Sequence, residues 1–404
     1  MRVGQESELL RSLSLLWLAG LATRVTVLAV PPVLPLMRND FGMSETQVGL
    51  LIGLPLATWA LAAVPGSLFV AKWGALRTVL IGLLLTAIAG ALRAAAGSVS
   101  PLYLFTLLMG FGIAIMQPSN ARLLREWLPQ KLGLGSAVST NGLLMGCTLG
   151  PLLTAPLIMP LLGQSWRFDL VFWSAPVLVT ALLFIAFAPA SAKPTGDGAF
   201  TRAGWWPEWK SAPIWLLGVT FGCNNAAFYG TNGFLPDYLA SIDRGELIGP
   251  ALACLNGSQV VTSALLLVFA ERLQGRLWPF FVFGLAPLIG ILGILAGTSA
   301  AALVVSAIII GACLAVTFII TMVLMLLLSP PEDVHRITAG MFAIAYALAL
   351  ALPVLCGALW DLTGLPWAAF IPVGLCSFVV TFIGAAMTRS RITKNSAGRY
   401  RPRA

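Results

Sequence analysis

Two arginines, Arg24 and Arg93, lie inside long stretches of apolar residues. A guanidinium at the depth of a bilayer costs at least about 2.5 kcal/mol and keeps its charge, so it must face a protein interior or a water-filled cavity. Arg24 lies near the midpoint of its stretch, too far from either end to reach the membrane surface. Because a guanidinium donates two parallel hydrogen bonds to a planar anion, we predict that Arg24 binds an anionic substrate. A structural arginine that donates to helix carbonyls is the alternative.

Arg93 differs from Arg24 in its depth. It lies about four residues from the end of its apolar stretch, close enough for a long side chain to reach the interface. We therefore expect a structural arginine that extends to the membrane surface, with a role in attracting or gating anions as the alternative.

Neutral polar residues accompany the arginines. Buried amides and hydroxyls need partners, so each of them either bonds across helices or binds a polar solute. They are most frequent in the stretch 212–239, which we expect to form a second wall of the site. The predicted binding residues are Arg24, Gln117, Asn120, Asn141, Asn224, Asn225, Phe228, Tyr229, Asn232, Gln259 and Tyr346. Asn256 belongs to the same polar set, and Trp59 is either an aromatic wall of the site or a core residue.

Metal and catalytic chemistry have little support. The six cysteines lie singly within apolar stretches, and the one histidine, His335, falls in a polar loop, so neither a disulfide framework nor a zinc site is indicated. Of eleven methionines, only Met322 and Met325 pair closely within a stretch, which argues against copper transport. We predict no cofactor and no enzymatic activity, because no nucleophile, base and metal ligands cluster at one depth.

The composition identifies the elements that carry these residues. The 404 residues are 58% hydrophobic and 10% charged, with a mean hydropathy of +0.92, which excludes a water-soluble fold. Apolar runs of about 20 residues are long enough to cross a hydrocarbon core as helices. The net charge of +9 includes six basic residues among the last sixteen, which fits a tail at an anionic lipid surface better than nucleic-acid binding.

The apolar runs predict an all-α membrane protein with twelve transmembrane helices. The spans are 12–37, 47–71, 78–97, 102–124, 133–160, 168–189, 212–239, 247–270, 278–297, 301–328, 339–360 and 366–388. Lysine and arginine number 19 at the termini and the loops on their side, against three in the opposite loops, namely Arg38, Arg167 and Arg244. This asymmetry places both termini in the cytoplasm of a multi-pass protein of the plasma (inner) membrane.

The chain divides into two similar halves. A polar linker, 190–211, separates an N-terminal six-helix bundle, 1–189, from a C-terminal bundle with a basic tail, 212–404. The first span ends in Val33-Leu34-Pro35 and the seventh in Phe234-Leu235-Pro236, and aligning the two prolines places Arg24 opposite Asn225. The repeat predicts two bundles related by pseudo-two-fold symmetry around a central path.

Small residues mark one face of the fifth span. Gly135, Ser139, Gly142, Gly146 and Gly150 recur at helical spacing. Such a face predicts close packing of a neighbouring helix, with a sliding surface between the halves as the alternative.

Several motifs carry a family resemblance along the whole chain. The loop after the second span keeps Lys72, Gly74 and Arg77 of the loop motif of the major facilitator superfamily, with Ala71 in place of its aspartate, and the second half keeps the acid in Glu271-Arg272. The chain therefore resembles that superfamily. The stretches RVTVLAVPPVLPLM (24–37) and FYGTNGFLPDYL (228–239) are similar to its cyanate and nitroimidazole transporter (CynX-like) branch.

The resemblance implies transport by alternating access. It places one substrate site near mid-membrane between the halves, lined mainly by helices 1, 4, 5, 7, 8, 10 and 11, and it suggests a small anion or a small polar heterocycle as substrate. It also implies gating or structural roles for Lys72, Gly74, Arg77, Glu271 and Arg272, alongside Arg93. Many members of the superfamily act as monomers, and we expect a monomer here.

The positions of the acids bear on the coupling ion. Asp40, Glu45, Asp237 and Asp361 fall at the outer edge of the spans, and no acid is placed at a membrane centre. Because proton-coupled transport commonly uses a titratable group inside the membrane, the sequence favours anion uniport or exchange. Proton symport through an edge acid, or with protons carried by the substrate, stays open. The alternative function is a proton-coupled exporter of a small drug-like or nitro-heterocyclic compound.

Overall fold

The structure is a computed structural model that describes residues 2–189, 209, 211–273, 276–297, 299–328 and 334–398. Within these ranges, the side chains at 2–5, 62–68, 71, 267–272, 326–327, 334–336, 339 and 390–398 are not described. Every regular element in the described ranges is a helix. The predicted linker, apart from Trp209 and Ser211, and the predicted loop pair Glu271-Arg272 lie outside the described side chains.

The helices of the first half begin at Arg2 and end at Phe187. They are α1 (Arg2–Ala22), α2 (Val25–Leu28), η1 (Pro31–Val33), α3 (Leu34–Phe41), α4 (Glu45–Trp73), α5 (Ala75–Leu92), η2 (Arg93–Ala95), α6 (Val99–Trp127), α7 (Leu132–Leu153), η3 (Thr154–Ile158), α8 (Met159–Leu161) and α9 (Trp166–Phe187).

The helices of the second half begin at Ala212 and end at Gly398. They are α10 (Ala212–Ser241), η4 (Gly245–Leu247), α11 (Ile248–Leu273), α12 (Trp278–Ala296), α13 (Ala300–Leu328), α14 (Val334–Thr363), η5 (Pro366–Phe370) and α15 (Ile371–Gly398).

These helices match the predicted spans closely. Nine helical segments of the described chain are long and apolar enough to cross a membrane. The helices α4, α10 and α11 add segments of 29, 30 and 26 residues, consistent with twelve spans. The first span, predicted over 12–37, is one membrane segment, Glu6–Phe41, but its helix begins at Arg2 and is interrupted between α1 and α3.

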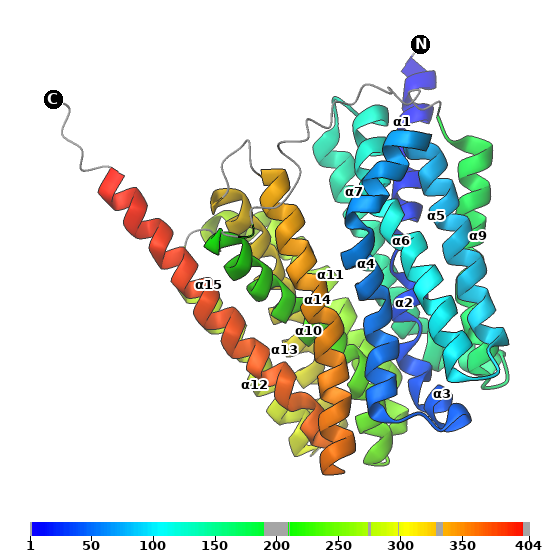
Figure 1. Ribbon diagram of the computed structural model, residues 1–404, viewed down its shortest axis with the longest axis vertical. Coiled ribbons are helices and arrows are strands. Elements are labelled where there is room, and N and C mark those ends of the chain that lie inside the picture. Colours follow the sequence, from blue (N-terminus) through cyan, green and yellow to red (C-terminus); the bar gives the residue numbers. More distant parts are fainter. Residues whose placement is uncertain are drawn as a thin grey trace.

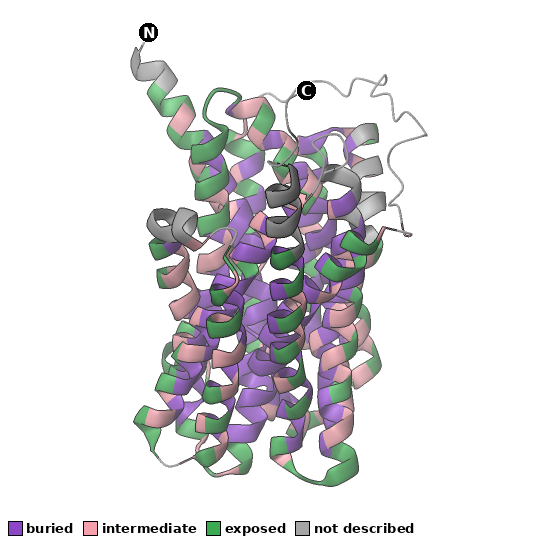
Figure 2. Ribbon diagram, turned by 90° about the vertical axis from the view of Figure 1, so that its left-hand side faces the viewer, coloured by how far each residue is buried: buried purple, intermediate pink, exposed green. Residues whose placement is uncertain are grey.

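The helices form two bundles, as the repeat predicts (Figure 1). In the first half, α1 packs on α7 and α9, and α5 packs on α6 and α9. In the second half, α10 packs on α14 and α15, and α11 packs on α13. The most extensive contacts between the halves are those of α4 with α14 and of α7 with α11. Figure 2 shows buried residues gathered in the interior of the helices, whereas many outward positions are exposed.

The halves meet at the end opposite the termini and diverge toward the end where the termini lie (Figure 1). At the meeting end, a Cβ added to Gly49 would clash with the carbonyl of Pro353, and one added to Gly357 would clash with the carbonyl of Glu45. Backbones this close require glycine at both positions. We call this end the closed end.

The glycine face of α7 packs within the first half. A Cβ at Gly142 would meet the carbonyl of Trp17, and one at Gly146 would meet the carbonyl of Leu21, both in α1. The predicted role in close helix packing is therefore confirmed. The face does not slide on the second half, since it is covered by α1.

Candidate functional site

Arg24 lies at the interruption of the first membrane segment. The helix α1 ends at Ala22, and Arg24 precedes α2 with φ −126° and ψ −33°. Further along, Pro31 and Pro32 have no N–H groups, so the carbonyls of Val27 and Leu28 lose their usual helical donors. The backbone at Arg24 is also pressed against α7, where a Cβ on Gly146 would lie 3.2 Å from the Arg24 Cβ. Local sequence therefore fixes the position from which the guanidinium extends.

Aromatic residues from both halves surround the Arg24 side chain. The Arg24 Cζ lies 4.0 Å from the centroid of the Trp59 ring, a cation–π contact with α4. The Trp59 ring lies edge-on to Tyr229 of α10 at 6.3 Å and to Tyr346 of α14 at 5.6 Å between centroids. Arg24 interacts electrostatically with the hydroxyls of both tyrosines. We call Arg24, Trp59, Gln117, Tyr229 and Tyr346 the central cluster.

Two hydrogen-bond donors of the central cluster have no acceptor. The Nη1 of Arg24 and the Nε1 of Trp59 are buried, and neither has a hydrogen-bond partner. Among the residues that the structure describes, no carboxylate forms an ion pair with Arg24. Guanidinium and indole nitrogens only donate, so both groups need an acceptor, and an anion supplies one.

Gln117 and Asn120 of α6 approach the cluster from the first half. Gln117 is exposed although it lies in the interior of α6, and its side chain interacts with Tyr346 of the second half. It therefore faces accessible space between the halves. Asn120 is half-buried, and its Oδ1 has no partner.

The asparagines of α10 hold helices together. Asn224 donates to the carbonyl of Leu314 at 3.3 Å and accepts from the Thr317 hydroxyl, both in α13. Asn232 accepts from Asn256 of α11 at 2.8 Å. Asn225 donates to the carbonyl of Phe221, one turn back in its own helix. The structure gives these amides hydrogen-bond partners within the second half.

The remaining predicted residues lie around the cluster or apart from it. Phe228 packs edge-on against Tyr229 at 5.0 Å. Asn141 is exposed and accepts from Trp17 Nε1 at 2.9 Å within the first half. The Nε2 of Gln259 is buried and has no hydrogen-bond partner among the residues that the structure describes.

Arg93 does not reach the membrane surface, and that prediction is wrong. Its side chain is 2% exposed, donating from Nη2 to the carbonyl of Thr26 at 3.0 Å and from Nε to the carbonyl of Gly90 at 3.3 Å. The Thr26 carbonyl is free for this bond because α2 ends at Leu28 and the Val30 N–H donates to the carbonyl of Val27 instead. The acid Asp169 of α9, fully buried, interacts electrostatically with Arg93. These internal partners hold Arg93 inside the bundle.

Arg93 also lines a small cavity between the halves. The cavity holds about 30 Å³ and is bordered by Arg93 and Thr106 of the first half and by Tyr229 and Asn232 of the second. This volume accommodates a water-sized group. The cavity thus connects the surroundings of Arg93 with the central cluster through Tyr229.

The loop residues of the family motif lie at the terminal end. Gly74 separates α4 from α5 with φ +85°, a conformation that favours glycine. Lys72 and Arg77 beside it are exposed, and the Lys72 Nζ lies 5.9 Å from the Trp73 ring centroid. Gly74 is a structural turn, whereas the two cations are free to contact solvent or lipid.

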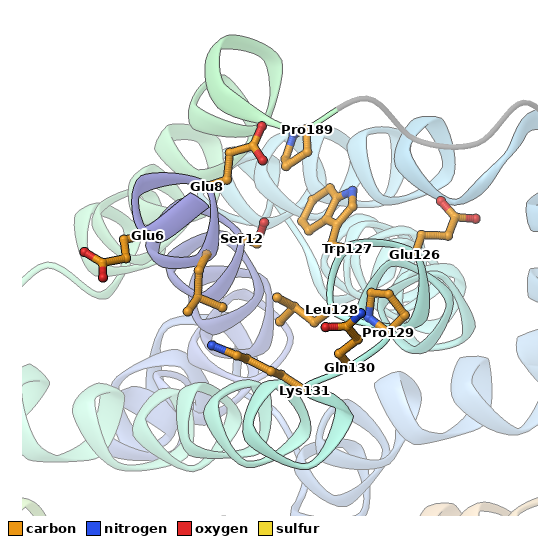
Figure 3. Close-up of a pocket in the computed structure, with 11 residues that line it drawn as sticks. Glu6, Glu8, Ser12, Glu126, Trp127, Leu128, Pro129, Gln130, Lys131 and Pro189 are labelled. Atoms are coloured by element: carbon orange, nitrogen blue, oxygen red, sulfur yellow. The ribbon is translucent and has the colours of Figure 1, made fainter. Parts of the chain in front are cut away.

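A larger pocket lies away from the central cluster (Figure 3). It holds about 700 Å³ at the terminal end of the first half. Its lining includes Glu6, Glu8, Ser12, Trp127 and Lys131. Every lining residue belongs to the first half, so this pocket is not part of a path between the halves.

Comparison with known proteins points to the same family that the sequence motifs resemble. The family model described as Major Facilitator Superfamily matches residues 16–272. The uncharacterized transporter YycB of Bacillus subtilis (strain 168) is 25% identical over 366 residues, covering 90% of this chain and 89% of that protein. The cyanate transport protein CynX of Escherichia coli (strain K12) is 27% identical over 264 residues, covering 65% and 67% of the two chains.

A solved structure shares the fold. The inward open conformation of the xylose transporter XylE from E. coli superposes with a TM-score of 0.75 at 12% identity, covering 94% of this chain and 95% of that one. At this identity the likeness concerns the arrangement of helices alone.

Proposed function

This chain belongs to the Major Facilitator Superfamily, and from that premise we propose that it moves a small anion across the membrane by alternating access. It is a multi-pass membrane transporter of small solutes, not an enzyme. The anionic substrate, with Arg24 as its charge partner, is the part that we propose.

One observation carries the proposal. Arg24 Nη1 and Trp59 Nε1 are buried donors without acceptors, on two side chains in direct contact between the halves. Leaving a buried donor unpaired costs about 1 to 3 kcal/mol, more when it is charged. An anion that accepts from both donors removes this cost and places its charge on Arg24. Tyr229, Tyr346 and Gln117 add hydroxyl and amide contacts around it.

The site favours a compact anion. A cyanate-like or nitrate-like ion, or a short carboxylate, presents the oxygen or nitrogen acceptors that a guanidinium fork binds. One relative, CynX, is named a cyanate transport protein, and this supports the smallest of these anions.

The conformation supports a simple transport cycle. The halves touch at the closed end and diverge toward the termini, which the loop charges place in the cytoplasm of the plasma membrane. An anion enters or leaves through the terminal end in this state, and rocking of the halves opens the closed end in the next. Uniport or exchange by a monomer is the simplest form of this cycle.

A thermal-shift experiment tests the anion site. The detergent-purified protein is heated with cyanate, nitrate, formate or acetate, beside the variant Arg24→Ala and the control Arg77→Ala, which removes an exposed arginine. A ligand that binds the folded state raises the melting temperature. At a concentration of 100 times its Kd, the ligand adds about 2.7 kcal/mol to the free energy of unfolding. We expect stabilisation by at least one anion in the native protein and in Arg77→Ala, and none in Arg24→Ala.

The opposite results point elsewhere. Equal stabilisation of all three proteins by an uncharged nitro-heterocycle, with no effect of anions, contradicts the proposal and favours the exporter. Anion stabilisation that persists in Arg24→Ala removes Arg24 from the site.

A further inference from the structure

Two buried acids share one arginine at the closed end. Arg38 of α3 lies 3.0 Å from an oxygen of Glu45, the first residue of α4, and 3.7 Å from an oxygen of Asp237 in α10. Glu45 is 3% exposed and Asp237 is fully buried, and none of their four carboxylate oxygens has a hydrogen-bond partner of good geometry. Two carboxylates therefore face a single positive charge away from water.

The charges around this group do not balance. The groups that act electrostatically on Glu45 are Asp237, Arg38 and the exposed Asp361 of α14, and Arg38 is the one that acts on Asp237. Of the other two loop cations at this end, Arg167 pairs with Asp40 at 2.9 Å, and Arg244 is not among the groups that act on Glu45 or Asp237. If Glu45 and Asp237 were both ionised, the buried group that they form with Arg38 would carry one uncompensated negative charge. One proton on the pair removes it, as in other pairs of close carboxylates.

The proton affinity of Glu45 agrees with this balance. Glu45 lies outside the apolar stretch 47–71, and burial raises the pKa of its carboxyl to about 8; the charge of Asp237 adds to the rise, and Arg38 opposes it. The ordinary pKa of a glutamate in water is about 4.3.

The pair spans the two halves. Arg38 and Glu45 belong to the first half, whereas Asp237 belongs to the second. Opening the closed end separates Asp237 from Glu45 and hydrates both acids. Their burial and their mutual repulsion then no longer raise the proton affinity of the pair.

We propose that Glu45 and Asp237 form a proton-binding site that holds one proton while this end is closed and releases it to the same side when the end opens. The inference rests on the proposed transport function. It adds the proton as the ligand that sets the balance between the states closed and open at this end. Protons on that side then act as a co-ligand for closure, which favours the state open at the terminal end.

The sign of the pH effect follows from linkage. The closed state binds the proton with a pKa of about 8 and the open state with an ordinary value near 4.3, so closure is favoured at low pH. As the pH rises between these values, the ratio of open to closed molecules increases by up to about tenfold per unit, and it levels off above about pH 8.

Hydrogen–deuterium exchange of the full-length protein measures this opening without any substrate. Exchange of the backbone amides at the start of α4 and the end of α14, corrected for the intrinsic pH dependence, is followed from pH 5 to 9. The variants are Glu45→Gln and Asp237→Asn, which mimic the protonated acids, and the control is Asp40→Asn, an exposed acid at the same end. A melting curve of each variant verifies that it is folded.

We expect exchange at the closed end to rise with pH in the native protein and in Asp40→Asn. In Glu45→Gln, the change in the open-to-closed ratio between pH 5 and pH 9 should be at least tenfold smaller than in the native protein. If Glu45→Gln does not fold, the same result is expected of Asp237→Asn. A native protein whose opening is independent of pH, or variants that keep the native dependence, overturn the proton site. Because no anion is present, failure here is distinct from failure of the anion site in the thermal-shift experiment.

Discussion

At the residue scale, the central cluster is defined by what its donors lack. Arg24 could have been satisfied by helix carbonyls, as Arg93 is by Thr26 and Gly90. Instead one of its nitrogens is buried and unpaired beside an equally unpaired indole nitrogen of Trp59. The contrast between the two arginines supports the proposed binding role of Arg24 and a structural role for Arg93 more clearly than their depth in the membrane does.

The substitution Trp59→Phe tests whether the indole donor serves the substrate. It keeps an aromatic ring against Arg24 and removes the N–H together with part of the indole, so we expect the affinity for the stabilising anion to fall about tenfold, as for loss of a hydrogen bond to a charged group. Without ligand, the melting temperature should not fall through loss of that donor, because it is unpaired. Titration of the thermal shift measures both effects.

Trp127→Phe is the matched control for this substitution. Trp127 also has a buried Nε1 without a partner, but it lies at the terminal end of α6. Its replacement should leave the anion affinity unchanged. An equal loss of affinity in both variants, or none in Trp59→Phe, contradicts the assignment of Trp59 to the site.

At the scale of elements, the interrupted first segment depends on a distant arginine. The carbonyl of Thr26 accepts from Arg93, which reaches it from the end of α5 and is accompanied by Asp169 of α9. Three helices thereby hold the turn that carries Arg24. Arg93 is a positioning residue for that turn.

The substitution Arg93→Met should lower the stability by about 1.5 to 3 kcal/mol, because the Thr26 carbonyl loses a charged donor and Asp169 loses its nearby cation. Adding Asp169→Asn should restore part of this loss, since the buried acid then carries no charge. The exposed Arg77→Met should change the stability by less than about 0.5 kcal/mol. Thermal unfolding of the four proteins provides the measurement, and an Arg93→Met variant as stable as Arg77→Met contradicts the role.

Sequence reasoning worked best for elements and least well for their contacts. Apolar length alone predicts the helices, and the glycine spacing predicts the packing face of α7, because both are local properties. The partners of Arg93 are 67 residues away at Thr26 and in another helix at Asp169, so no local pattern reveals them. Trp59 carries no signal beyond being aromatic, and it becomes a site residue only through the fold. Pro31 and Pro32 do carry a local signal for the break in the first span, because neither has a backbone N–H.

At the scale of the whole molecule, the closed end is held by a helix cap that crosses between the halves. The carboxylate of Asp361 in α14 accepts from the backbone N–H groups of Glu45 at 2.9 Å and Thr46 at 2.8 Å, and from the Thr46 hydroxyl. These are the first N–H groups of α4, which have no helical acceptors and favour a negative charge. The second half thus supplies the cap for a helix of the first half.

The substitution Asp361→Asn should shift the molecule toward the state that is open at this end. It removes the charge and one acceptor oxygen, a loss of about 0.5 to 2 kcal/mol for a helix cap, which corresponds to roughly a 2- to 30-fold rise in the open-to-closed ratio. The same exchange experiment at the start of α4 measures the rise at fixed pH. The matched control is Gln47→Ala, which removes a cap bond within the first half, where the Gln47 side chain accepts from the Ser44 backbone N–H at 3.0 Å. Because that bond stays intact in either state, Gln47→Ala should loosen the helix end without altering exchange at the end of α14. If both variants raise exchange at α14 equally, Asp361 stabilises only the helix and does not hold the halves together.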